Sequence, residues 1–165
     1  MLRRAGRSIL LTSLVLFCVA SVSGQSHPRE YQRKVLVGIN AVRVVVEGLD
    51  SDAVHFGLSK DRLRTLTELR LRQSGISVSP DARPFVYVRV NLLKLDGVRG
   101  CAAHVDVRVR ALVQLVHSSK TAFAAIWSEG TVLIGPSSSC KQHVEDALGE
   151  LLDLFANDYL AANPR

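Results

Sequence analysis

The sequence predicts an α+β fold, a two-layer sandwich with the element order β-α-β-β-β-α. Both helices are expected on one face of a mainly antiparallel sheet. Residues 85–95 and 102–116 alternate apolar and polar side chains, the pattern of strands that bury one face. The C-terminal segment instead repeats its apolar residues every three or four positions, as a helix with one buried face does. Strands with one apolar face need helices on that face only, which gives the two layers.

The composition agrees with a single folded domain. The chain has 165 residues, of which 47% are hydrophobic and 22% are charged. This composition excludes disordered, collagen-like and coiled-coil proteins. A chain of this length can bury a hydrophobic core.

The first two predicted elements precede the alternating strands. Residues 35–49 are apolar and β-branched, which predicts a strand with a kink at Gly38. A helix is predicted over 60–74, because Ser59 is a good N-cap and Gly75 suits the position after a helix C-terminus. The first strand and the strand at 85–95 are joined through this helix, so the two would be parallel if they are adjacent.

Three strands and one helix make up the remainder. An Asp-Gly pair at 96–97 begins a hairpin-like connection between the strands at 85–95 and 102–116. A third strand is predicted over 121–135, with a break near Glu129 and Gly130. Serines at 137–139 offer caps for the last helix. The apolar stripe of that helix contains Val144, Ala147, Leu148, Leu151, Leu152, Phe155 and Tyr159.

Residues 1–24 have the three parts of a cleavable secretory signal. Arginines at 3, 4 and 7 precede a mostly apolar stretch from Ile9 to Ala20, and small residues follow up to Gly24. The apolar stretch is shorter than the about 20 residues of a membrane-spanning helix. We therefore expect a signal peptide at 1–24, a flexible leader at 25–33, one domain over 34–165, and no stable membrane span after cleavage. The expected location is periplasmic or secreted, and an uncleaved anchor is the alternative.

The charge distribution weakens the first suggestion of a nucleic-acid partner. The net charge of the whole chain is +6, but three arginines lie in the predicted signal. The remaining residues carry 18 basic and 15 acidic side chains, a net charge of about +3. Within them the predicted helix at 60–74 carries a net +3 and residues 141–165 a net −3. The two helices are therefore expected to complement each other, although single surface pairs contribute only about 0–1 kcal/mol.

Two cysteines, Cys101 and Cys140, remain after signal removal. In an oxidising compartment an even pair predicts a disulfide. Cys101 opens one long strand, and Cys140 follows shortly after the end of its expected antiparallel neighbour. The bond would attach the last helix to the sheet. A redox-active pair is the alternative, but the chain has no Cys-x-x-Cys motif.

The polar face of the predicted sheet is the candidate interaction surface. Arginines alternate with aromatic residues there, as on some sheets that bind single-stranded RNA. The predicted export signal argues against nucleic acid, so we expect an envelope or secreted protein as the partner. An ordinary solvated face and strand addition at a sheet edge are the alternatives. The candidate residues are Tyr87, Arg89, Arg108, Arg110 and Trp127.

No motif in the chain predicts a cofactor, a metal ion or a catalytic centre. His104 and Asp106 share one strand face, and His143 is the one candidate for a third metal ligand. Ser139 and His143 lie four residues apart, but no G-x-S-x-G turn surrounds the serine. The chain also has no phosphate-binding loop and no dinucleotide fingerprint.

Two short segments carry a resemblance to small uncharacterised proteins that bacteria secrete. These are LRLRQSGI at 69–76, which matches an L-R-x-x-G-I helix end, and FANDYLAANP at 155–164, which matches an F-x-N-D-Y-L-A-x-N-P tail. The resemblance brings no known activity to carry over. At the level of topology alone the layout is similar to the N-terminal domain of TolB and to LptE, although this chain lacks their propeller and lipobox respectively.

The preferred hypothesis is a non-enzymatic binding or assembly module. A small hydrolase or other enzyme with a site around His104 and Asp106 on the open sheet face is the first alternative, and a nucleic-acid-binding protein is the second. A deep polar pocket beside these two residues would favour an enzyme, and a flat sheet face would count against one.

Overall fold

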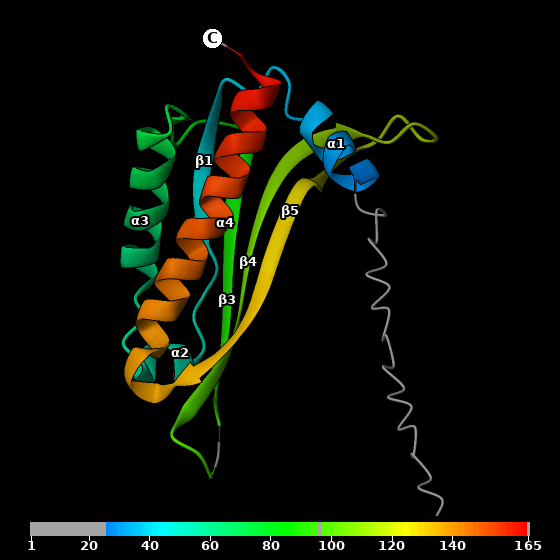
Figure 1. The fold of residues 1–165 in the computed structure, drawn as a ribbon. Coiled ribbons are helices and arrows are strands. Elements are labelled where there is room, and N and C mark those ends of the chain that lie inside the picture. Colours follow the sequence, from blue (N-terminus) through cyan, green and yellow to red (C-terminus); the bar gives the residue numbers. More distant parts are fainter. Residues whose placement is uncertain (1–25, 96, 165) are drawn as a thin grey trace, which may run out of the picture.

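The computed structural model describes residues 26–95 and 97–164 and shows an α+β fold with a five-stranded mixed sheet (Figure 1). A single turn of 3₁₀ helix, Ser137–Ser139, leads into the last helix. The α-helices are α1 (Ser26–Lys34), α2 (Ser51–His55), α3 (Lys60–Gln73) and α4 (Cys140–Ala162). The strands are β1 (Ala41–Val46), β2 (Ser77–Val78), β3 (Phe85–Leu95), β4 (Gly100–Gln114) and β5 (Thr121–Pro136).

The sheet combines parallel and antiparallel pairs in the order β2-β1-β3-β4-β5. β3, β4 and β5 form an antiparallel meander, as the alternating pattern predicts. β1 lies beside β3 and runs parallel to it, which confirms the expectation that followed from their connection through a helix. β2 is parallel to β1 and was not predicted, because two residues are too short to produce a periodic pattern.

α3 and α4 lie side by side against one face of the sheet (Figure 1). The inward residues of the strands are mostly valines, which branch at Cβ and suit a pleated, half-buried surface. Leu63 and Leu71 of α3 and Phe155 of α4 are fully buried against them. The inward valines are Val42, Val44, Val46, Val86, Val88, Val90, Val105, Val107 and Val109.

Two segments differ from the sequence-based expectation. The strand expected over 35–49 covers only Ala41–Val46, and Gly38 adopts a φ of 80°, a left-handed conformation that interrupts an extended chain. The leader expected at 25–33 contains most of α1, because this polar segment has a docking partner in the folded domain. Arg29 and Arg33 of α1 both pair with the buried carboxylate of Asp158.

The ends of α3 agree with the predicted capping residues. The Ser59 side chain accepts a hydrogen bond from the backbone N–H of Arg62, and Gly75 has a φ of 79° just after the helix. The serines before α4 form the 3₁₀ turn, and none of them caps α4 through its side chain. The sheet irregularity lies between Val109 and Arg110, opposite Ile126, and the break expected near Glu129 and Gly130 is wrong.

The opposite charges of α3 and α4 meet in two ion pairs. The Arg62 guanidinium donates to Glu145 at 2.6 and 2.8 Å, and Arg70 donates to Asp153 through two of its nitrogens. The hydrogen bonds from these arginines, together with their charge, lower the pKa of Glu145 and of Asp153 despite some burial. The predicted electrostatic complementarity of the two helices is therefore confirmed.

The predicted signal peptide lies outside the described residues. Among the helices of residues 26–95 and 97–164, none combines the length and the apolar character needed to cross a bilayer.

Candidate docking face of the sheet

The face of the sheet opposite α3 and α4, the open face, carries arginine and aromatic side chains towards one end and aliphatic side chains towards the other. Cross-strand neighbours point to the same side, so the register defines rows across this open face. One row contains Arg43, Phe85 and Arg110. The row that follows towards the opposite end of the face contains Val45, Tyr87, Arg108 and Ser128. Arg89, Asp106 and Gly130 form the row after that, beside Glu47.

Two carboxylates on this face are each paired with an arginine. The Nε of Arg89 lies 3.1 Å from an oxygen of Glu47, and the Nε of Arg108 lies 2.7 Å from an oxygen of Asp106. The Asp106 side chain is 8% exposed, whereas the Glu47 side chain is 39% exposed. Asp106 therefore depends on Arg108 for compensation of its charge, since a buried carboxylate without a partner is costly.

Two further arginines lie over aromatic rings. The guanidinium carbon of Arg43 is 5.4 Å from the centre of the Phe85 ring, and that of Arg110 is 5.1 Å from the Tyr87 ring. Both distances fall within the range of cation–π interactions. In the part of the chain that the structure describes, neither guanidinium has a carboxylate partner, and the Nε of Arg110 is buried without a hydrogen-bond partner.

The aromatic rings form a small cluster at this end of the open face. The Phe85 ring makes edge contacts with Tyr87 and with Phe123, whose side chain is 58% exposed. Burial raises the pKa of Tyr87, and its hydrogen bond to Glu47 together with the Glu47 charge raises it further. The Tyr87 hydroxyl is therefore a neutral donor at physiological pH.

Trp127 does not belong to the open face. Its side chain is 1% exposed, lies against Phe155, and donates from Nε1 to Asp158 at 3.1 Å. The β-bulge at Ile126 reverses the alternation of β5, so that Trp127 sits opposite Val109 on the side of the helices. The expectation that Trp127 lies with the arginines on the open face is therefore wrong.

The far end of the open face is apolar. Leu93, Val132 and Ile134 are 61%, 70% and 74% exposed. A shallow hollow of about 260 Å³ is lined there by Leu93, Val132 and the ring of His104, among others. The open face thus changes from arginine and aromatic residues to aliphatic ones along the direction of the strands.

The residues considered for metal binding or catalysis are not brought together. His104 and Asp106 flank Gly130 on the open face, whereas His143 lies over Gly135 on the side of the helices. Ser139 donates to the carbonyl of Pro136, and no cluster of three metal-ligating side chains occurs among the residues described. On the open face, Arg108 occupies the Asp106 carboxylate.

A groove of about 500 Å³ lies between α3 and α4. Its charged residues include Arg62, Arg70 and Glu145, all of which take part in the ion pairs that join the helices. These groups serve the packing of the two helices, and we assign no site to the groove.

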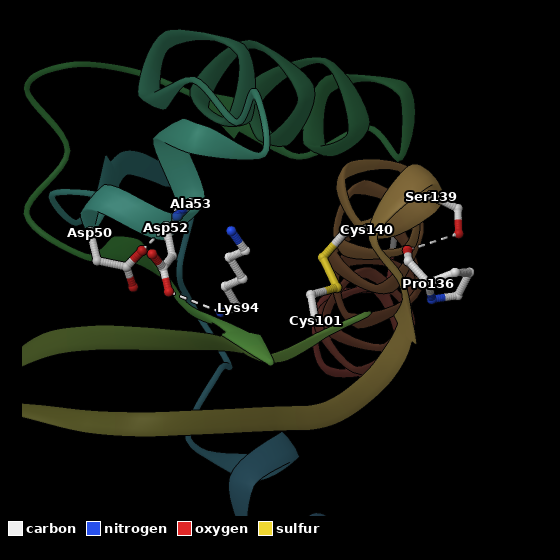
Figure 2. Close-up of a disulfide and its surroundings, with 8 residues drawn as sticks. All are labelled: Asp50, Asp52, Ala53, Lys94, Cys101, Pro136, Ser139 and Cys140. Carbon is white, nitrogen blue, oxygen red and sulfur yellow. Dashed lines mark hydrogen bonds between the residues drawn. A yellow bond between two sulfur atoms is a disulfide. The ribbon is translucent and has the colours of Figure 1, made fainter. Parts of the chain in front are cut away.

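The predicted disulfide is present between Cys101 and Cys140 (Figure 2). The two Cα atoms are 6.3 Å apart, and both side chains are fully buried. The bond connects the beginning of β4 to the first residue of α4. It therefore links the sheet to its largest covering helix.

Carboxylates of the α2 region cover an exposed strand edge, a feature that the sequence pattern did not reveal. β3 extends beyond the end of β1, which leaves backbone N–H groups of β3 without a strand partner. Asp50 accepts from the N–H of Leu92 at 3.1 Å, and Asp52 accepts from that of Lys94 at 2.9 Å. Asp50 also caps α2 at Ala53 (Figure 2). The Asp50 cap is the one local signal that could have indicated this short helix.

The Tyr159 and Asn163 pair at the end of α4 fixes that helix to the chain after α1. The Tyr159 hydroxyl donates to the carbonyl of Ile39 at 2.5 Å. Asn163 accepts from the N–H of Gly38 and donates to the carbonyl of Leu36. Together with the hydrogen bonds that Asp158 accepts from Arg29, Arg33 and Trp127, these contacts show that the FANDYLAANP segment attaches the end of α4 to α1, to the chain after it and to β5.

No family model matches the chain, and no curated protein matches it. Among solved structures, a PelC dodecamer from Paraburkholderia phytofirmans is similar with a TM-score of 0.41 and 17% identity, over 68% of this chain and 85% of that chain. A minor lipoprotein from Acinetobacter baumannii gives a TM-score of 0.40 and 10% identity, over 76% and 93% of the two chains. A hypothetical protein from Chlamydia trachomatis gives 0.38 and 13%, over 73% and 94%. Similarities this low carry no argument about function, and these three do not support a specific resemblance to TolB or LptE.

Proposed function

We propose that the protein is a periplasmic or secreted, non-enzymatic module that binds another protein through the open face of its sheet. The observation that carries this proposal is the arrangement of arginines and aromatic rings on that face. Arginine, tyrosine and phenylalanine are enriched at protein interfaces. The signal-like pattern of residues 1–24 supports the location.

The shape of the face favours a macromolecular partner over a small substrate. Its hollow of about 260 Å³ is shallow and apolar, whereas small-molecule sites usually enclose about 300–1,000 Å³ with convergent polar groups. The Asp106 carboxylate is already paired with Arg108, and the hollow beside His104 is shallow and apolar, so no observation favours the hydrolase alternative.

Photo-cross-linking in intact cells tests this proposal. A photoreactive amino acid at Asn91, on the open face, is expected to capture a reproducible partner that mass spectrometry identifies. The matched control places the same group at Leu69 of α3, which is 51% exposed on the other side of the molecule. Charge reversal by Arg89→Glu should weaken the capture, because Arg89 lies in an exposed pair that contributes little to folding. Absence of a reproducible partner at Asn91, or the same partners from both positions, would contradict the proposal.

A further inference from the structure

The arginines of the open face differ in how much of their charge is compensated. Arg89 and Arg108 pair with Glu47 and Asp106, the carboxylates of the rows described above. Arg43 and Arg110 form no ion pair with any carboxylate among the residues described. They flank Phe85 in one row across three strands. The surplus positive charge of the face is therefore concentrated in the row of Arg43, Phe85 and Arg110.

The aromatic rings hold these two guanidiniums in place. An arginine that stacks on a ring retains its outward N–H groups for bidentate contact with a carboxylate. The buried Nε of Arg110 shows that part of this side chain is already desolvated in the free protein. Less side-chain entropy is therefore lost when an anion binds here than at a freely mobile surface arginine.

The same stacking argues for a peptide and against a nucleic acid. Proteins that bind single strands offer open ring faces on which bases stack. Here Arg43 covers Phe85 and Arg110 covers Tyr87, so the guanidiniums and not the ring faces meet an incoming ligand. Beside them Phe123 and Leu112 are 58% and 45% exposed and offer apolar contact.

We propose that the row of Arg43, Phe85 and Arg110 is the binding site for an acidic, extended segment of the partner protein, and this proposal rests on the proposed function. Two strand spacings separate the two arginines, on the order of 10 Å between Cα atoms. Carboxylates two residues apart on one side of an extended peptide lie about 7 Å apart, and their side chains can reach both guanidiniums. An apolar residue of the same peptide would rest on Phe123.

Fluorescence anisotropy with synthetic peptides tests the proposal. The probe is a short fluorescein-labelled peptide in which glutamates alternate with serine and phenylalanine, and its neutral twin carries glutamine in place of glutamate. We expect the glutamate peptide to bind at least about ten-fold more tightly than its twin, and less tightly as salt is added.

Matched variants locate the binding. The double variant Arg43→Gln/Arg110→Gln should weaken binding of the glutamate peptide about ten-fold. Arg64→Gln/Arg99→Gln removes the same charge from α3 and from the turn between β3 and β4, and should change affinity by less than about two-fold. Arg43→Lys/Arg110→Lys keeps the charge, and an intermediate affinity is expected because lysine lacks the planar fork. If the glutamine double variant does not fold, the peptide affinity of this lysine double variant still tests the proposal.

Several results would overturn the proposal. Equal affinity for the two peptides would do so, and so would equal losses of affinity for the glutamate peptide in both glutamine double variants. A labelled oligouridine that binds more tightly than the glutamate peptide, and whose binding the Arg43 and Arg110 substitutions abolish, would overturn it as well. If the peptide fails but cross-linking at Asn91 still captures a partner, the acidic-segment proposal falls and the proposed function stands. If both fail, the proposed function falls as well.

Discussion

The two faces of the sheet are built from alternate residues of the same strands, yet they hold charge in different ways. On the covered side, Asp158 is 1% exposed and accepts hydrogen bonds from Trp127, Arg29 and Arg33. On the open side, the Arg89 and Glu47 side chains are paired but remain 45% and 39% exposed.

This difference separates two kinds of contribution. A buried carboxylate with several donors stabilises the fold, because removing it leaves those donors without their partner. An exposed pair contributes little to folding, since water competes for both groups. Side chains of the covered face should therefore control stability, and those of the open face, apart from the buried Asp106 and its partner Arg108, should control binding.

The largest expected effect compares two aromatic residues of β5. Trp127→Ala should lower the free energy of unfolding by about 3–5 kcal/mol, because it empties a core site and removes the hydrogen bond to Asp158. Phe123→Ala should cost less than about 1 kcal/mol, since that ring is 58% exposed. Urea unfolding followed by circular dichroism measures both variants. Similar losses from the two substitutions would break the distinction between the faces.

A second effect concerns the attachment of the covering layer to the sheet. Replacing both Cys101 and Cys140 by serine should cost about 2–4 kcal/mol, because the disulfide restricts a long loop of the unfolded chain. The cysteines are 39 positions apart. Mass measurement with alkylation should find two thiols in the mature protein only after reduction. Two thiols that alkylate without reductant would show that the layers are not joined in this way.

The smallest of the three effects depends on pH. Burial acts to raise the pKa of Asp158, but hydrogen bonds from Trp127 and Arg33 and the charges of Arg29 and Arg33 outweigh it, so its pKa is lowered overall. The unfolded carboxyl titrates near 3.8. The stabilisation is therefore present above about pH 4 and is lost as the pH falls through the lower pKa of the folded state.

The variant Asp158→Asn should accordingly lose about 1–3 kcal/mol at neutral pH and much less in acid. Unfolding free energies measured across this range give the comparison. Asp153→Asn, at a half-exposed pair on the helix surface, is the control and should lose no more than about 1 kcal/mol. A loss at Asp158 that does not change with pH would point to packing alone.

The elements that the sequence predicted well are those with a local cause. The strand at 85–95 was expected with the bounds that β3 has, because its alternation runs unbroken over the whole segment. α3 matches its prediction to within one residue, since Ser59 and Gly75 mark both of its ends. The disulfide followed from the compartment and from the antiparallel arrangement of the last two strands.

The remaining features depend on contacts between distant segments. α1 is polar and lacks an apolar stripe, and it is fixed by Asp158, which lies 125 positions beyond Arg33. The place of Trp127 depends on a bulge that no local pattern marks. Arg43 joins the candidate site only because β1 pairs with β3 in one parallel register. Periodicity within a strand could not supply that alignment.

The anchoring of α4 has a consequence for the order in which the molecule can be completed. Residues 29–39 attach to Asp158, Tyr159 and Asn163, which are made at least 120 positions later in synthesis. The segment around Leu36 therefore cannot complete its contacts until α4 has been made. A chain interrupted before Asp158 would leave Trp127 without its acceptor and α1 without its ion pairs, and could not reach the native state.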